Sequence, residues 1–170
     1  MRSLDMILSI PGLVFVLLLV SMLGPKPLLI VLGVGIAFTP PVARIARGAT
    51  LEVVGREFVE WSEAIGLARR ELLFRELLPN IATPVLIELG LRLRYSIGVI
   101  AAVSFLGFGI QPPAADWGLM INENRLSIAS QPWAIVAPIA CIAVFTIGTN
   151  LVAEGIARTI AGLDRTDDPR

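Results

Sequence analysis

The chain is poor in the side chains that carry most enzyme chemistry. It has no histidine, its single cysteine is Cys141, and its only lysine is Lys26. Lys26 does not lie in the Gly-x-x-x-x-Gly-Lys pattern whose backbone amides cradle phosphates. One cysteine cannot form an internal disulfide, and it does not supply the ligand set of a cysteine-based metal site. The sequence therefore predicts no catalytic, cofactor-binding or metal-binding residue, and no P-loop for ATP.

Three ionisable residues near the start of an apolar run are the remaining candidates for chemistry. They are Glu88, Arg92 and Arg94. Ionisable groups at membrane depth usually face the interior of a helix bundle or water. If the helix begins near Pro84, Arg94 lies about 15 Å along it, close to mid-bilayer, and the three residues would line a pathway. The alternative is that the helix extends into the cytoplasm and these charges mark its exit.

The elements that must position these residues are predicted to be membrane helices. Of the 170 residues, 55% are hydrophobic and 16% are charged, where a globular protein has about 25% charged residues. Four uncharged runs, each about long enough to cross a bilayer, occupy 6–25, 27–43, 95–115 and 126–153. We therefore expect an all-α membrane protein forming a single domain over 1–170, with spans at about 6–24, 28–46, 84–109 and 133–153.

The arginines predict the orientation of these spans. Cytoplasmic flanks are enriched in Lys and Arg, and only Lys26 and Arg125 fall on one of the two sides. Both termini and the segment 47–83 are therefore expected in the cytoplasm, with the loop QPPAADWG outside. In that loop, Trp117 is interpreted as an anchor in the aromatic belt, and the alternative is that Asp116 and Trp117 contact a substrate-delivering protein.

The charged segment 47–83 contains a helix with two different faces. Phe58, Trp61 and Ile65 recur at helical spacing, and acidic residues occupy the other face. Gly66 is expected to end or sharply bend this helix. The pattern predicts an amphipathic helix lying at the cytoplasmic surface.

A second helix is expected directly after this turn, over 69–78. It would place Leu73 and Leu77 on one side, and Pro79 is expected to stop it. A helix, turn and helix of this kind has two interpretations. It is either an interfacial linker resting on the lipid headgroups or a docking element for a soluble partner.

The spacing within this segment resembles the "EAA" loop of ABC-importer permeases. Glu60, Gly66, Leu78 and Pro79 stand in register with that loop, whereas Trp61 and Ser62 replace its two alanines and Leu77 replaces its isoleucine. The resemblance continues through LDMILSIP (4–11), ARIARG (43–48), EAIGLARRELLFRELLPN (63–80), SFLGFGIQPPAADWGLM (104–120) and NLVAEGI (150–156). The chain is similar to the C-type permease subunit of dipeptide and oligopeptide importers.

This resemblance implies a type I importer permease fold in the bacterial inner membrane, crossing it several times. The implied partners are a second permease subunit, two cytoplasmic ATP-binding subunits that carry the ATPase activity, and an external substrate-binding protein; no nucleic acid is implied. The residues implied to form the ATPase-coupling loop are Glu60, Ala64, Gly66, Leu77, Leu78 and Pro79.

The resemblance also implies a longer chain. Permeases of this kind have six spans, and the sequence begins at what would be their third span. The alternative to a transporting subunit is therefore a truncated, non-transporting scaffold or remnant that keeps the docking loop.

Overall fold

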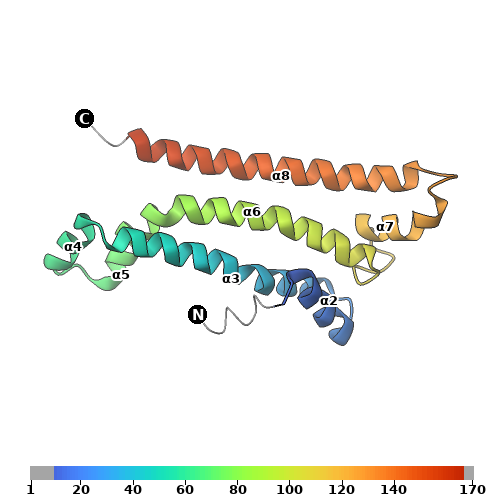
Figure 1. The fold of residues 1–170 in the computed structure, drawn as a ribbon, viewed down its shortest axis with the longest axis horizontal. Helices are drawn as coiled ribbons and strands as arrows, with labels where there is room; N and C mark the ends of the chain where they lie inside the picture. Colours follow the sequence, from blue (N-terminus) through green and yellow to red (C-terminus); the bar gives the residue numbers. More distant parts are fainter. Residues whose placement is uncertain (1–9, 167–170) are drawn as a thin grey trace. The chain divides into compact units, whose positions relative to one another are not determined.

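The computed structural model describes residues 10–166, except for the side chains of Glu63 and of residues 160–166. The described residues form helices joined by turns and loops, without a strand (Figure 1). In chain order the helices are α2 (Gly12–Leu23), α3 (Pro27–Val54), α4 (Glu57–Ala64), α5 (Arg69–Glu71), the π-helix η1 (Leu72–Leu77), α6 (Leu78–Phe105), α7 (Trp117–Asn124), the short 3₁₀ helix η2 (Arg125–Ser127) and α8 (Trp133–Thr166). The expected all-α class is confirmed for this part of the chain.

Two compact units share the long helices. Unit 1 takes in residues up to Pro40 together with Arg92–Asn150, and unit 2 takes in Pro41–Leu91 and the residues from Leu151 onward. Helices α3, α6 and α8 each contribute one end to each unit.

Two of the described helices are long and apolar enough to cross a membrane. They are Pro27–Val54 and Trp133–Thr159, and both extend beyond the spans expected at 28–46 and 133–153. The expected span 6–24 lies partly outside the described residues, and its described part is the 12-residue helix α2. Helix α6 has the length of a span but carries the three charged residues noted above.

Helix α6 ends earlier than the expected boundary at residue 109, because a glycine turn closes it. Gly107 has a φ of 87°, and its N–H donates to Ser104 O at 2.9 Å. The N–H of Phe108 donates to Val103 O at 3.0 Å. These two bonds form the Schellman motif, which satisfies the last carbonyls of a helix through a residue in left-handed conformation.

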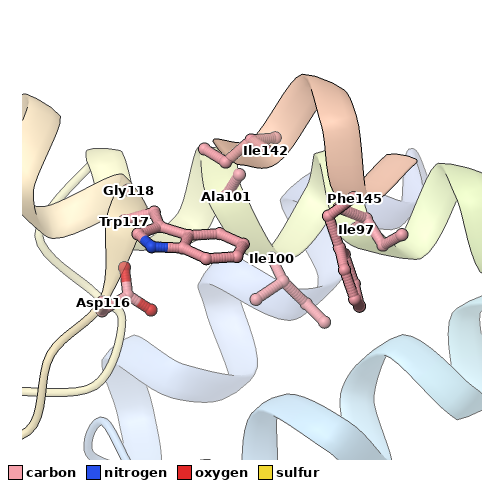
Figure 2. Close-up of a pocket in the computed structure, with 8 residues that line it drawn as sticks. All are labelled: Ile97, Ile100, Ala101, Asp116, Trp117, Gly118, Ile142 and Phe145. Carbon is pink, nitrogen blue, oxygen red and sulfur yellow. The ribbon is translucent and has the colours of Figure 1, made fainter. Parts of the chain in front are cut away.

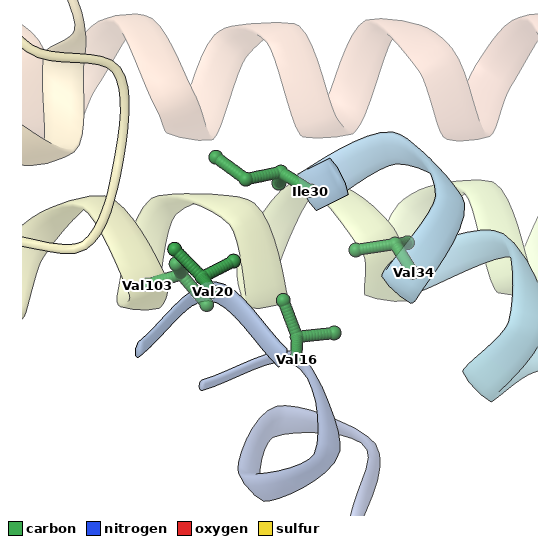
Figure 3. Close-up of a cluster of buried hydrophobic side chains, with 5 residues drawn as sticks. All are labelled: Val16, Val20, Ile30, Val34 and Val103. Atoms are coloured by element: carbon green, nitrogen blue, oxygen red, sulfur yellow. The ribbon is translucent and has the colours of Figure 1, made fainter. Parts of the chain in front are cut away.

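The core of unit 1 lies where α2, α3 and α6 meet (Figure 3). Each of the first two helices contributes a pair of side chains four residues apart, which lie on one helix face. With one residue of α6 they form a buried cluster of Val16, Val20, Ile30, Val34 and Val103.

The core of unit 2 joins the charged segment to the start of α6. Its buried side chains are Val53, Val59, Leu72, Leu77 and Ile81, and each is at most 8% exposed. They come from α3, α4, η1 and α6 in turn. This cluster fixes the segment 57–77 on the first turns of a long helix.

Candidate functional site

One side of helix α4 packs in the core of unit 2, and the opposite side is exposed. Val59 is 2% exposed, and Phe58 packs beside it against the core of unit 2. Trp61 and Ile65 are 74% and 71% exposed. The expected apolar face of Phe58, Trp61 and Ile65 is therefore wrong in one respect: Val59 makes the buried contact, and the other two large side chains point away from the core.

Gly66 ends helix α4, as its place in the sequence predicts. Its φ is 79°, a conformation that side-chain-bearing residues rarely adopt. The N–H of Leu67 donates to Ser62 O at 3.1 Å, the six-to-one bond of a Schellman motif. A Cβ built on Gly66 would find nothing within 4 Å, so backbone conformation alone requires glycine here.

The second helix of the pair is different from the expected one. Leu77 is buried, but Leu73 is 46% exposed, and Leu72 is the buried companion of Leu77. Residues 72–77 form a π-helix, whose turn is wider than the 3.6-residue turn that the expectation assumed. Leu72 and Leu77 are its two buried residues, so the expectation that Leu73 and Leu77 lie on one side is wrong.

Pro79 does not stop this helix, which is a second correction. The chain continues from η1 into α6 through Leu78 and Pro79 to Phe105. The Leu78 N–H donates to Leu73 O, so the hydrogen bonding changes from π to α at this residue. Pro79 then stands in the first turn of the α-helical stretch, where a proline is tolerated.

The predicted coupling residues are mostly accessible. Glu60, Ala64, Gly66, Leu78 and Pro79 are exposed, and Leu77 alone of the six is buried in the core of unit 2. We call the exposed side of α4 and of the turn after it, formed by Glu60, Trp61, Ala64 and Ile65, the coupling surface. Sequence reasoning missed Phe74, which is 63% exposed on η1 and which no simple periodicity identifies.

The predicted pathway residues are spread along α6. Glu88 is 8% exposed. The guanidinium carbons of Arg92 and Arg94 lie 5.7 and 5.1 Å from the ring centroid of Tyr95, within range of a cation–π interaction. Tyr95 was not among the residues predicted from the sequence. Tyr95 is 52% exposed, whereas Arg92 and Arg94 are half-buried.

Asp116 of the expected outward loop holds α7 against α6. One of its carboxylate oxygens accepts from Ser104 Oγ at 3.0 Å, and the other accepts from Leu119 N at 2.9 Å. A third bond runs from Asn122 Nδ2 to Phe105 O. Ser104 is 1% exposed, so this connection is inside the protein. The sequence offered no sign of it, because the two side chains are twelve residues apart.

Two glycines make the junction around Ser104 possible. A Cβ on Gly109 would lie 2.5 Å from Ser104 Cβ, and one on Gly118 would lie 2.5 Å from Ala101 O. Neither distance is compatible with a side chain. The indole of Trp117 meets the ring of Phe145 edge to face, with centroids 6.1 Å apart. The loop and α7 therefore form a closely packed cap within unit 1.

Comparison with known proteins identifies the family. Residues 1–162 match the family described as "Binding-protein-dependent transport system inner membrane component". The chain is 32% identical over 156 residues to the glutathione transport system permease protein GsiD of Escherichia coli O1:K1 / APEC, and equally to GsiD of Shigella flexneri serotype 5b (strain 8401) and of Escherichia coli O157:H7. These matches cover 92% of the chain but 52% of the relatives, so the chain spans about half their length. The chain belongs to the family of inner-membrane components of binding-protein-dependent transport systems.

Proposed function

We propose that the chain is a permease subunit of a binding-protein-dependent ABC importer and that α4 is its contact with an ATPase subunit. The observation that carries this proposal is the exposure of Trp61 on α4 and of Ile65 directly after it, while the other side of α4 is fixed in a core. Tryptophan is enriched among the residues that dominate binding at protein interfaces. Glu60 is exposed on the same helix and supplies charge at the rim of the contact.

The core of unit 2 gives this contact a mechanical connection. Val59 packs with Leu72 and Leu77, and the same cluster includes Ile81 in the second turn of α6. A displacement of α4 is therefore passed through packed side chains to a helix of 28 residues. We propose that ATP binding and hydrolysis in the partner subunits move α6 by this route.

The proposed substrates are dipeptides and oligopeptides. Two observations support this class: the resemblance of the motifs to peptide-importer permeases, and the identity to proteins named for glutathione transport. The family description supports the proposed external substrate-binding protein, and a second permease subunit would complete the pathway. The chain would cross the inner membrane four times, with both of its termini in the cytoplasm.

Co-purification of the ATPase with the permease tests the proposal. Trp61→Ala should weaken the ATPase complex by about thirtyfold, the effect of a hot-spot residue worth roughly 2 kcal/mol. Leu51→Ala is the matched control, because Leu51 is 64% exposed in the same unit but lies on α3. Glu60→Lys and Gly66→Glu should abolish ATP-driven uptake, and both variants should still be found in the membrane. If all three variants retain the ATPase and transport normally, residues 57–79 are an interfacial linker.

A further inference from the structure

One buried hydroxyl in unit 2 has no hydrogen-bond partner. Buried polar side chains are usually paired, and Asp116, which lines the pocket in Figure 2, accepts from Ser104 Oγ in this way. Thr83 Oγ1 is different. It is covered by protein atoms, and no group in the part of the chain that the structure describes bonds to it. A buried hydroxyl without a partner destabilises the conformation that contains it, so the packing around Thr83 must hold it there.

The other threonines show how a hydroxyl is ordinarily paired in these helices. A helical threonine can donate to the carbonyl three or four residues earlier. Every other threonine whose side chain the structure describes uses the spacing of four: Thr39, Thr50, Thr146, Thr149 and Thr159. Ser96 shows that the spacing of three is also used, since its hydroxyl donates to Leu93 O at 2.6 Å. The unpaired hydroxyl is therefore a property of the position of Thr83 in α6.

Pro84 leaves an acceptor without its usual donor beside this hydroxyl. It follows Thr83 directly, lies within α6 and has no N–H. In a regular α-helix the N–H at this position would donate to the carbonyl of Asn80. Asn80 stands three residues before Thr83, at a spacing that a threonine hydroxyl can bridge. A donor and an acceptor that lack their ordinary partners thus lie about one turn apart, and the structure has no bond between them.

This turn lies between the core of unit 2 and the remainder of α6. Ile81 is buried in the cluster that also holds Val59 of α4. A proline inside a helix permits a bend, because its ring pushes against the carbonyl four residues earlier and the missing bond leaves the turn open. A change of bend at Pro84 would move the carbonyl of Asn80 relative to the hydroxyl of Thr83. The bend can therefore make or break a bond between these two groups.

We propose that residues 80–84 are a two-state hinge in α6 and that the Thr83 hydroxyl donates to Asn80 O in the second state. In the described state, packing against the core of unit 2 holds the turn and the hydroxyl is unpaired. In the second state the bend at Pro84 differs, and the hydroxyl replaces the N–H that proline lacks. This hinge rests on the proposed function, in which the ATPase displaces α4 and the displacement reaches α6 through Ile81.

Thr83→Val tests the hinge, because valine has nearly the shape of threonine without the hydroxyl. With its partner subunits in proteoliposomes, this variant should take up a labelled dipeptide roughly fivefold more slowly, since the second state loses one hydrogen bond. Its thermal unfolding midpoint in detergent should rise by roughly 3 °C, since the described state loses an unpaired buried hydroxyl. Thr83→Ser keeps the hydroxyl and should restore uptake.

Thr50→Val is the matched control. Thr50 lies in the same unit, and its hydroxyl donates to Ala46 O at 2.7 Å. Valine there removes a bond that is already formed, so the unfolding midpoint should not rise, and uptake should be unchanged.

Pro84→Ala supplies a second variant that acts on the acceptor. Alanine restores the N–H that donates to Asn80 O, so this carbonyl is no longer free for the hydroxyl and the helix loses its proline bend. Uptake should fall as it does in Thr83→Val, and the double variant should be no slower than either single one. Each variant should still co-purify with the ATPase, because the coupling surface is unchanged.

Three results would overturn the hinge. An unfolding midpoint lowered by Thr83→Val would show that the hydroxyl already has a partner in the described state, such as a bound water. Unchanged uptake by Thr83→Val would show that the hydroxyl has no part in transport. Losses that add in the double variant would show that Thr83 and Pro84 act separately. Failure of the proposed function is distinguishable, because the unchanged protein would then lack ATP-driven uptake or the co-purifying ATPase.

Discussion

Ser104 Oγ donates a 3.0 Å hydrogen bond to Asp116, whose other carboxylate oxygen accepts from Leu119 N at the first turn of α7. A single carboxylate therefore caps one helix and ties it to the end of another. The hydroxyl it accepts from is almost completely buried.

Asp116→Ala should lower the free energy of unfolding by about 2 kcal/mol. The change removes a helix cap worth about 1 kcal/mol and leaves the buried hydroxyl of Ser104 without its acceptor, at a cost of similar size. Asp116→Asn keeps an oxygen acceptor and should cost less. Thermal unfolding in detergent measures both variants, and equal midpoints for Asp116→Ala and the unchanged protein would contradict this role.

Gly118→Ala should impair folding more strongly than any alanine substitution at an open glycine. Its Cβ would lie 2.5 Å from Ala101 O, a backbone atom that cannot rotate away. Gly98→Ala is the control, because nothing lies within 4 Å of its Cβ and alanine is the better helix former. The yield of monodisperse protein after detergent extraction distinguishes them. Equal yields would show that the cap around Ser104 tolerates a shift of α7.

Gly66→Ala should destabilise the turn after α4 by roughly 1 kcal/mol, because alanine is strained at a φ of 79°. Gly66→Asn should be milder, since asparagine tolerates the left-handed region. Gly48→Ala, within α3 and with open space around it, serves as the control. Limited proteolysis between residues 60 and 72 reports the loosened turn. Identical cleavage of all three variants would refute the conformational requirement.

The topology of the chain is tested with single cysteines in a Cys141→Ala background. Ala64→Cys should react with an impermeant thiol reagent only from the cytoplasmic side, and Ala114→Cys only from outside. Both positions are exposed, so access depends on the side of the membrane. The reverse labelling pattern would contradict the orientation inferred from the arginines.

Local chemistry explains which features could be predicted from the sequence. Gly66 was predicted to end α4 because glycine is the residue for a left-handed helix terminus, and the structure has that terminus. The long apolar runs predicted helices at α3 and α8 in the same way. Such features depend on a few neighbouring residues.

The features that were missed depend on hydrogen-bond pattern and distant contacts. A period of 3.6 residues places Leu73 with Leu77, but in the π-helix Leu72 and Leu77 are the buried residues and Leu73 is half exposed. Pro79 is expected to stop a helix because proline breaks helix interiors. That expectation fails because the hydrogen bonding changes from π to α at Leu78, a change that the sequence does not reveal. The bond between Ser104 and Asp116 forms only when the loop between them has folded.

The π-helix at Leu72–Leu77 also sets the helical phase of everything after it. Each residue of an α-helix advances the side chains by 100° around the axis, and a π-turn accommodates one residue more than an α-turn of similar length. If Leu72–Leu77 were wound as an α-helix instead, the following part of α6 would be turned by about a quarter of a circle relative to η1. Glu88 would leave its buried position, and Ile81 would leave the core that holds Val59. The wide turn thus determines which residues of α6 pack in the core that holds α4.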